Sequence, residues 1–240
     1  MTEHEKIPEM ICQKEQLPIA LEPRQTALVI IDVQRFFTRP DSEFVQVFQK
    51  LSPGAMNGYF QRVSSTVLPK IQESQNCFRS LRLPVIFCVF GSYARNGQDL
   101  PCWLKDFDKL GLQLLGRRPN PVVNGASWQI DDAIAPLPGE LIINKTSTGA
   151  LSSTSVDQTL HNMGITSLGV CGLTTAVCVG LTARQTAPTV ASALLLSVMH
   201  ARSYLRKCTR PLCCPLSTFL VRCVLRENVR NFSERHWNHV

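Results

Sequence analysis

The sequence predicts an α/β fold in which helices cover both faces of a mainly parallel, Rossmann-like sheet, giving a three-layer α/β/α architecture. Two observations support this fold class. Short apolar runs recur along the chain, and such runs are typical of strands that are buried on both faces. Segments with the apolar spacing of amphipathic helices lie between the runs. The chain has 240 residues, 44% of them apolar, which suits a single domain with a sizeable core.

The expected strands are short and separated by polar or turn-forming residues. They cover residues 26–31, 85–90, 140–144 and 167–172. The second run is unbroken and lies between Pro84 and Gly91, as expected of a strand in the interior of a sheet.

Two helices are expected between the strands. Apolar residues recur at helical spacing from Phe60 to Leu81 and predict a helix that faces the core. Ser64 to Thr66 are candidate caps for this helix, and Pro69 would be tolerated only in a first turn. A second helix is expected over residues 156–163, where Gly164 would end it.

Two regions are expected to be irregular. Residues 34–37 and 51–58, the latter containing Pro and Gly, are interpreted as an active-site loop. Residues 91–124 are rich in Gly, Pro and basic side chains and contain Trp103. We interpret this long stretch as a variable loop that shapes a pocket.

Three chemically active residues stand at or beyond strand ends. Asp32 follows residues 26–31, Lys145 follows residues 140–144, and Cys178 lies just beyond residues 167–172. Because the carboxyl ends of parallel strands form one ligand crevice, these side chains could converge as a hydrolytic triad. A helix start after the last of these strands would favour the thiolate of Cys178. Taken singly, each residue has an ordinary alternative as a cap, a surface lysine or a core thiol.

Several segments around these residues resemble the isochorismatase-like cysteine hydrolases over about residues 23–184. The order and spacing of the segments carry the resemblance. They are Ala27-Leu-Val-Ile-Ile-Asp-Val-Gln34, Pro84-Val-Ile-Phe-Cys-Val-Phe90, Lys145-Thr-Ser-Thr-Gly-Ala-Leu151 and Gly172-Leu-Thr-Thr-Ala-Val-Cys-Val179 with Thr182-Ala-Arg184.

The resemblance implies roles for individual residues. Asp32 would be the general base, Lys145 would stabilise the thiolate, and Cys178 would attack an amide or carbamoyl carbonyl of a small-molecule substrate. Backbone N–H groups of Thr174 and Cys178 would form the oxyanion hole, with a cis peptide bond before Thr174. The substrate pocket would include Gln34, Phe37 and Trp128, although Trp128 and Trp103 could equally be ordinary packing residues. Members of the family are typically homo-oligomers.

No metal ion or other cofactor is expected. The nicotinamidase branch of the family binds its metal through histidines in the region that corresponds to residues 85–124, and this chain has no histidine there. His236 and His239 are a poor ligand set by themselves, because two histidines supply too few ligands for a zinc site.

The sequence predicts three parts: an N-terminal segment, 1–22, a hydrolase domain, 23–184, and an atypical tail, 185–240. The first ten residues do not resemble a signal peptide, and no apolar run is long enough to span a membrane. The ten cysteines are scattered, which favours reduced thiols. We therefore expect a cytoplasmic protein that does not bind a membrane.

The tail departs from the family pattern. It has no glycine and carries eight basic against two acidic residues (8 − 2 = +6), whereas residues 1–184 carry 17 − 16 = +1. Reading Val198-Met199-His200-Ala201 from the third base of each codon permits Asp-Ala-Cys, which the family pattern places there. A frameshift or alternative splicing after Arg184 is therefore one interpretation of the tail, and a genuine tail is the other.

The unusual tail leaves two further functional classes open. If residues 185–240 do not supply the next strand, the strand over 167–172 is an exposed edge, and the C-terminal strand and helices of the fold are missing or replaced. The chain would then be a catalytically impaired isoform or an interaction protein. The second class is a basic nucleic-acid-binding module, but Pro211 and Pro215 interrupt the basic face and no aromatic stacking platform accompanies it.

Overall fold

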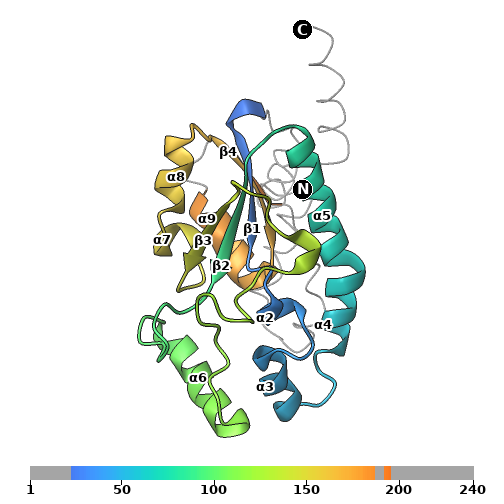
Figure 1. The fold of residues 1–240 in the computed structure, drawn as a ribbon, viewed down its shortest axis with the longest axis vertical. Helices are drawn as coiled ribbons and strands as arrows, with labels where there is room; N and C mark the ends of the chain where they lie inside the picture. The colour runs from blue at the N-terminus through green and yellow to red at the C-terminus, as the bar shows by residue number, and fades with distance from the viewer. Residues whose placement is uncertain (1–22, 187–191, 196–240) are drawn as a thin grey trace, which may run out of the picture.

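The computed structural model describes residues 23–186 and 192–195. Its sheet has five strands in the order β3-β2-β1-β4-β5, and all four strand pairs are parallel. The strands are β1 (Thr26–Ile31), β2 (Val85–Phe90), β3 (Leu141–Lys145), β4 (Ser167–Gly172) and β5 (Ser192–Leu195). Figure 1 shows helices on both sides of this sheet, so the predicted three-layer α/β/α fold is confirmed.

The side chains of β1 alternate between two separate cores. Leu28 and Ile30 pack in the cluster that includes Val67 and Ile71 of the long helical segment on one face. Ala27, Val29 and Ile31 pack in the other cluster, with residues of the helices on the opposite face. This two-sided burial explains why the strand is apolar without alternation.

The strand bounds agree closely with the sequence pattern. β1, β2 and β4 begin and end at the predicted residues, and every residue in them is buried. β3 is shifted by one residue, so Lys145 is its last residue instead of the residue after it. Leu141 and Ile142 are 41% and 44% exposed, because β3 forms an edge of the sheet.

The predicted helix after β1 begins earlier and has a local irregularity. It consists of α4 (Asn57–Arg62), the π-helical segment η2 (Val63–Val67) and α5 (Leu68–Ser80). Pro69 lies in the first turn of α5, as its missing N–H group requires. The expectation that Ser64 to Thr66 cap the helix is wrong, because these residues lie inside η2 and the Ser64 hydroxyl donates to Phe60 O and Gln61 O.

Both regions expected to be loops contain helices. Residues 34–38 include α2 (Arg35–Thr38), which α3 (Glu43–Leu51) follows. Residues 91–124 contain the fourteen-residue helix α6 (Cys102–Leu115). Figure 1 shows α3 and α6 beyond the carboxyl ends of the strands, and these two helices contact each other. The loop prediction for residues 91–124 is wrong at α6, which follows Pro101 without a side-chain cap, whereas residues 52–56 are irregular as predicted.

Short elements complete the described chain. The expected helix 156–163 is present as α8 and is followed by Gly164 at a φ of 68°. The remaining elements are η1 (Pro23–Gln25), η3 (Asp132–Ile134), α7 (Ala150–Ser153), α8 (Val156–Asn162), η4 (Thr175–Val179) and α9 (Gly180–Thr186).

The unusual tail supplies part of the next strand. Ser192 to Leu195 form β5, which pairs with Ser167 to Val170 of β4. That stretch of β4 is therefore not an exposed edge. The rest of the tail, and with it the frameshift interpretation and His236 and His239, lies outside the described residues, as does segment 1–22. Within the described part of the chain, no helix has the length and apolarity needed to cross a membrane.

Candidate active site

The structure brings Asp32, Lys145 and Cys178 together at the carboxyl end of the sheet. The side chains of Asp32 and Lys145 are fully buried, and Lys145 Nζ lies 2.8 Å from Asp32 Oδ2. Cys178 is 8% exposed and lies near both groups, whose charges act on the pKa of its thiol. Three separate strands position the groups, since Asp32 follows β1, Lys145 ends β3, and Cys178 lies in η4 after β4.

A close approach of two backbones sets the geometry of this site. Gly172 has a φ of 127°, and a Cβ atom there would lie 2.0 Å from the carbonyl oxygen of Ile31. Only glycine fits at this point. Asp32 has a left-handed φ of 53°, and its N–H donates to Cys88 O at 2.8 Å. A non-glycine residue in this conformation is uncommon and is often found at functional sites.

The ammonium group of Lys145 is held from several directions. Besides Asp32, it donates to Ser147 O at 2.9 Å, and it lies 5.4 Å from the centre of the Phe90 ring. Burial lowers the pKa of Lys145, but the opposing charges of Asp32 and Cys178 outweigh this effect and leave the pKa raised. The raised pKa favours the charged form of Lys145.

Burial lowers the pKa of a cationic group but raises the pKa of the other two groups of the cluster, Asp32 and Cys178. It raises the pKa of Asp32, although Lys145 and the Cys178 thiol act to lower it. It also raises the pKa of the Cys178 thiol, and the Asp32 charge adds to that effect. The expectation that the resting site favours the thiolate is therefore wrong. The thiol stays protonated at rest, next to a carboxylate whose affinity for a proton is increased.

The segment that carries Cys178 has the features implied by the resemblance. The peptide bond between Leu173 and Thr174 is cis, as implied. Thr174 directly precedes η4, and Cys178 is the fourth residue of η4. Leu173 N donates to Ile31 O at 2.8 Å and so continues the contact with the end of β1. The oxyanion-hole role of the Thr174 and Cys178 N–H groups stays a proposal.

A cavity of about 410 Å³ opens onto these residues and is lined by Lys145 and Cys178 among others. Phe37, expected in the substrate pocket, is one of its lining residues, as is Trp103. The predicted variable region thus does shape the cavity, mainly through α6, with Asn120 from the loop that follows the helix. Sequence reasoning missed most of the apolar wall, which consists of Phe36, Phe44, Phe48, Phe90, Leu104, Phe107 and Leu110.

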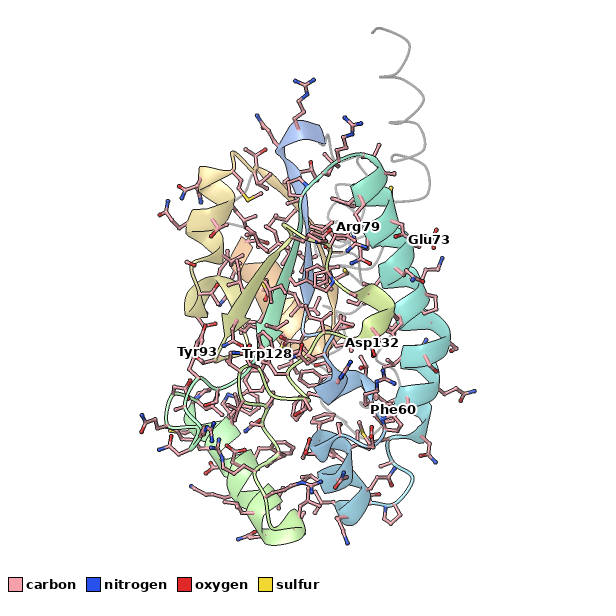
Figure 2. All side chains as sticks on the ribbon, in the orientation of Figure 1. Phe60, Glu73, Arg79, Tyr93, Trp128 and Asp132 are labelled. Atoms are coloured by element: carbon pink, nitrogen blue, oxygen red, sulfur yellow. The ribbon has the colours of Figure 1, made fainter. Side chains whose placement is uncertain are left out.

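Gln34 and Trp128 do not line this cavity but support the backbone behind it. The Gln34 side chain donates to Phe90 O and Trp128 O and accepts from Phe90 N. Trp128 Nε1 donates to Asn144 Oδ1, and Asn144 donates in turn to Gly91 O. Figure 2 shows Trp128 near the carboxyl ends of the strands, at the end of the sheet opposite to Arg79.

Within residues 23–186, no three His, Cys, Asp or Glu side chains lie close enough together to hold a metal ion. The chemistry that the described residues can provide is that of a buried thiol, a carboxylate and an ammonium group.

A comparison with protein families agrees with this geometry. The model of the isochorismatase domain matches residues 26–187, which include all three clustered side chains. The chain belongs to the isochorismatase family. Ureidoacrylate amidohydrolase RutB of Methylobacterium radiotolerans is 30% identical over 183 residues, covering 70% of this chain and 64% of that enzyme. The RutB of Pseudomonas syringae pv. syringae is 28% identical, with 70% and 67% covered.

Solved structures of the isochorismatase family share the fold. A cysteine hydrolase from Pseudomonas syringae pv. phaseolicola has a TM-score of 0.58 at 19% identity, covering 75% of this chain and 74% of that one. An isochorismatase family protein from Desulfovibrio vulgaris has a TM-score of 0.56 at 22% identity, covering 73% and 83%. At these identities the likeness concerns the fold.

Proposed function

We propose that this protein hydrolyses an amide or carbamoyl-type C–N bond of a small molecule, with Cys178 as the nucleophile. The observation that carries the proposal is the buried cluster of Asp32, Lys145 and Cys178 at the base of a cavity. The names of the RutB relatives describe amidohydrolases, which supports cleavage of this bond type. Because the chain spans about 64% of the first of these relatives, its own activity remains a proposal.

The first half of the reaction transfers the acyl group to the enzyme. Asp32 accepts the thiol proton, and the resulting thiolate of Cys178 then attacks the carbonyl carbon. Before this proton transfer the site holds a carboxylate, a thiol and an ammonium group. After it, the site holds a protonated Asp32, a thiolate and an ammonium group. Its net charge does not change, which matters because a net charge in a dry site is costly. Lys145 faces the thiolate that forms.

Collapse of the tetrahedral intermediate completes this half. N–H groups of Thr174 and Cys178 would stabilise the oxyanion. Asp32 returns its proton to the departing nitrogen as the C–N bond breaks, which leaves a thioester on Cys178. A water molecule then gives a proton to Asp32 and its oxygen attacks the thioester. The acid leaves, and the proton on Asp32 returns to the sulfur.

Ammonia release from a panel of primary amides and ureides tests the proposal. Cys178→Ala should lower kcat by at least about a thousandfold. Cys171→Ala is the matched control, since Cys171 is also a buried thiol but packs in the core away from the cavity. Equal activity of the Cys178→Ala variant and the parent chain would rule out the thiol as nucleophile.

Two further expectations remain proposals. We place the protein in the cytoplasm, supported by the free thiols of all five cysteines in the described part of the chain. We also propose that it forms a homo-oligomer, supported only by membership of the family. Light scattering coupled to gel filtration measures the second directly.

A further inference from the structure

We propose that the substrate of this site is a neutral amide or ureide whose acyl part is aromatic or of similar apolar shape, and that carboxylated substrates are rejected. This inference rests on the proposed function and adds the class of substrate. Its basis is the composition of the cavity wall next to Cys178.

Two helical segments supply facing apolar walls. Phe36 and Phe37 in α2, with Phe44 and Phe48 in α3, line one side of the cavity. Trp103, Leu104, Phe107 and Leu110 in α6 line the other side. The ring centres of Phe44 and Phe107 are 6.1 Å apart, as are those of Phe48 and Phe107, so the two walls meet at one end. Figure 1 shows α3 and α6 together beyond the sheet.

The aromatic wall continues to the reacting groups. The Phe36 ring lies 5.2 Å from that of Phe44 and 6.3 Å from that of Phe90. Phe90 in turn lies 5.4 Å from Lys145 Nζ. An acyl group attached to a carbonyl at Cys178 would therefore extend over an aromatic surface, where ring packing is favourable.

The size of the cavity fits a ring system. An apolar protein cavity of roughly 150 Å³ accommodates one benzene molecule. The cavity here measures about 410 Å³, which leaves room for an aromatic acyl group as well as the scissile amide. A very short acyl group would leave most of the apolar wall uncovered and would gain little from burial.

The charges argue against an anionic substrate. Lys145 is the one basic side chain that lines the cavity among the described residues, and Asp32 already neutralises it at 2.8 Å. Two arginines that follow α6 are also paired, Arg117 with Glu43 and Arg118 with Asp108. Asp106, at the cavity, is acidic and already pairs with the neighbouring Lys109. A substrate carboxylate would thus lose its hydration without gaining a counter-ion.

The test measures ammonia release by the full-length chain from benzamide, 2-naphthamide, acetamide and 4-carboxybenzamide. We expect kcat/KM for the aromatic amides to exceed that for acetamide by at least about tenfold, because the ring is buried. The added carboxylate should lower kcat/KM by at least about a hundredfold, mainly through KM.

A matched pair of variants in α6 sharpens the test. Leu110→Arg places a cation in the cavity wall and should raise kcat/KM for 4-carboxybenzamide while lowering it for benzamide. Leu112→Arg makes the same change at a residue that is 50% exposed and does not line the cavity, so it should alter neither value.

The outcomes separate this inference from the proposed function. Turnover that depends on Cys178 but favours acetamide or the carboxylated amide in the parent chain would overturn the substrate class and leave the proposed function standing. A lack of Cys178-dependent turnover of every amide and ureide would remove the proposed function, and the substrate class with it.

Discussion

Side chains are fixed differently at the carboxyl ends of the strands and on the helices that lie beyond these ends. Asp32 and Lys145 are fully buried, 2.8 Å apart, and anchored to strands whose register the sheet determines. The cavity wall on α3 and α6 consists of larger, partly exposed side chains such as Trp103, which is 53% exposed. We infer that the sheet provides the chemistry and that the added helices provide the selectivity. The first region should tolerate change poorly and the second should tolerate it well.

The largest expected contrast comes from replacing one glycine by alanine in each region. In Gly172→Ala the new Cβ would lie 2.0 Å from Ile31 O, at a φ of 127°. We expect a loss of more than about 4 kcal/mol in the free energy of unfolding, because two backbones must move apart. Gly116, which follows α6, has a φ of 70° and no atom within 4 Å of the added Cβ. Gly116→Ala should cost only roughly 1–2 kcal/mol for the left-handed conformation.

Urea unfolding of the two variants and the parent chain measures this contrast. Equal losses at the two positions would show that the carboxyl end of β4 adapts as easily as the end of α6. The proposed difference between the two regions would then be wrong.

The second contrast removes a lysine from an ion pair in each region. Lys145→Met leaves Asp32 buried without its partner, which should cost roughly 3–5 kcal/mol near neutral pH. Lys109→Met on α6 breaks an exposed pair with Asp106 and should have no measurable effect on stability. The double variant Asp32→Asn/Lys145→Met should recover most of the lost stability but none of the activity. Recovery of activity would show that the pair only supports the fold.

The thiols buried in the sheet are expected to have a smaller effect, on the pH dependence of stability. Burial raises the pKa of Cys88 and of Cys171 from 9.0 to about 12. A raised folded-state pKa gives a stabilising contribution that is complete below pH 9.0 and is lost between that value and about 12. At pH 10 each thiol should have lost roughly 1.4 kcal/mol of this contribution.

Urea unfolding at pH 7, 9 and 10 measures how the free energy of unfolding changes with pH. The variant Cys88→Ala/Cys171→Ala should lose less stability than the parent chain between pH 9 and pH 10, whatever its stability at pH 7. An identical pH dependence of the two chains would show that these thiols ionise as readily in the fold as in the unfolded chain.

The same division between regions explains what the sequence could predict. β1, β2 and β4 were predictable because strands buried on both faces must be apolar throughout. The convergence of Asp32, Lys145 and Cys178 followed from the parallel arrangement, in which strand ends meet at one edge. The protonation state of Cys178 was not predictable, because it depends on burial by residues far away in the sequence.

The cavity wall was harder to predict for a physical reason. α6 follows Pro101 without a side-chain cap and lies in a stretch rich in glycine and proline, so its start has no strong local signal. Its apolar face includes Leu104 and Phe107, but the surrounding glycines, prolines and basic residues favour a loop. Gln34 was expected beside the substrate, although its side chain is fully engaged by the backbone at Phe90 and Trp128.

The central claim is that Cys178 carries the acyl group during the reaction, and acid-quenched mass mapping tests it most directly. The full-length chain is mixed with a slowly hydrolysed amide, quenched during turnover and digested, and the peptide that contains Cys178 is weighed. We expect fragment ions of this peptide to place the mass of the acyl group on Cys178, with none on Cys171, and the peptides that contain Cys88 and Cys102 to gain none. Turnover at an unchanged rate in Cys178→Ala, with no acyl group on Cys178 in the parent chain, would contradict the account.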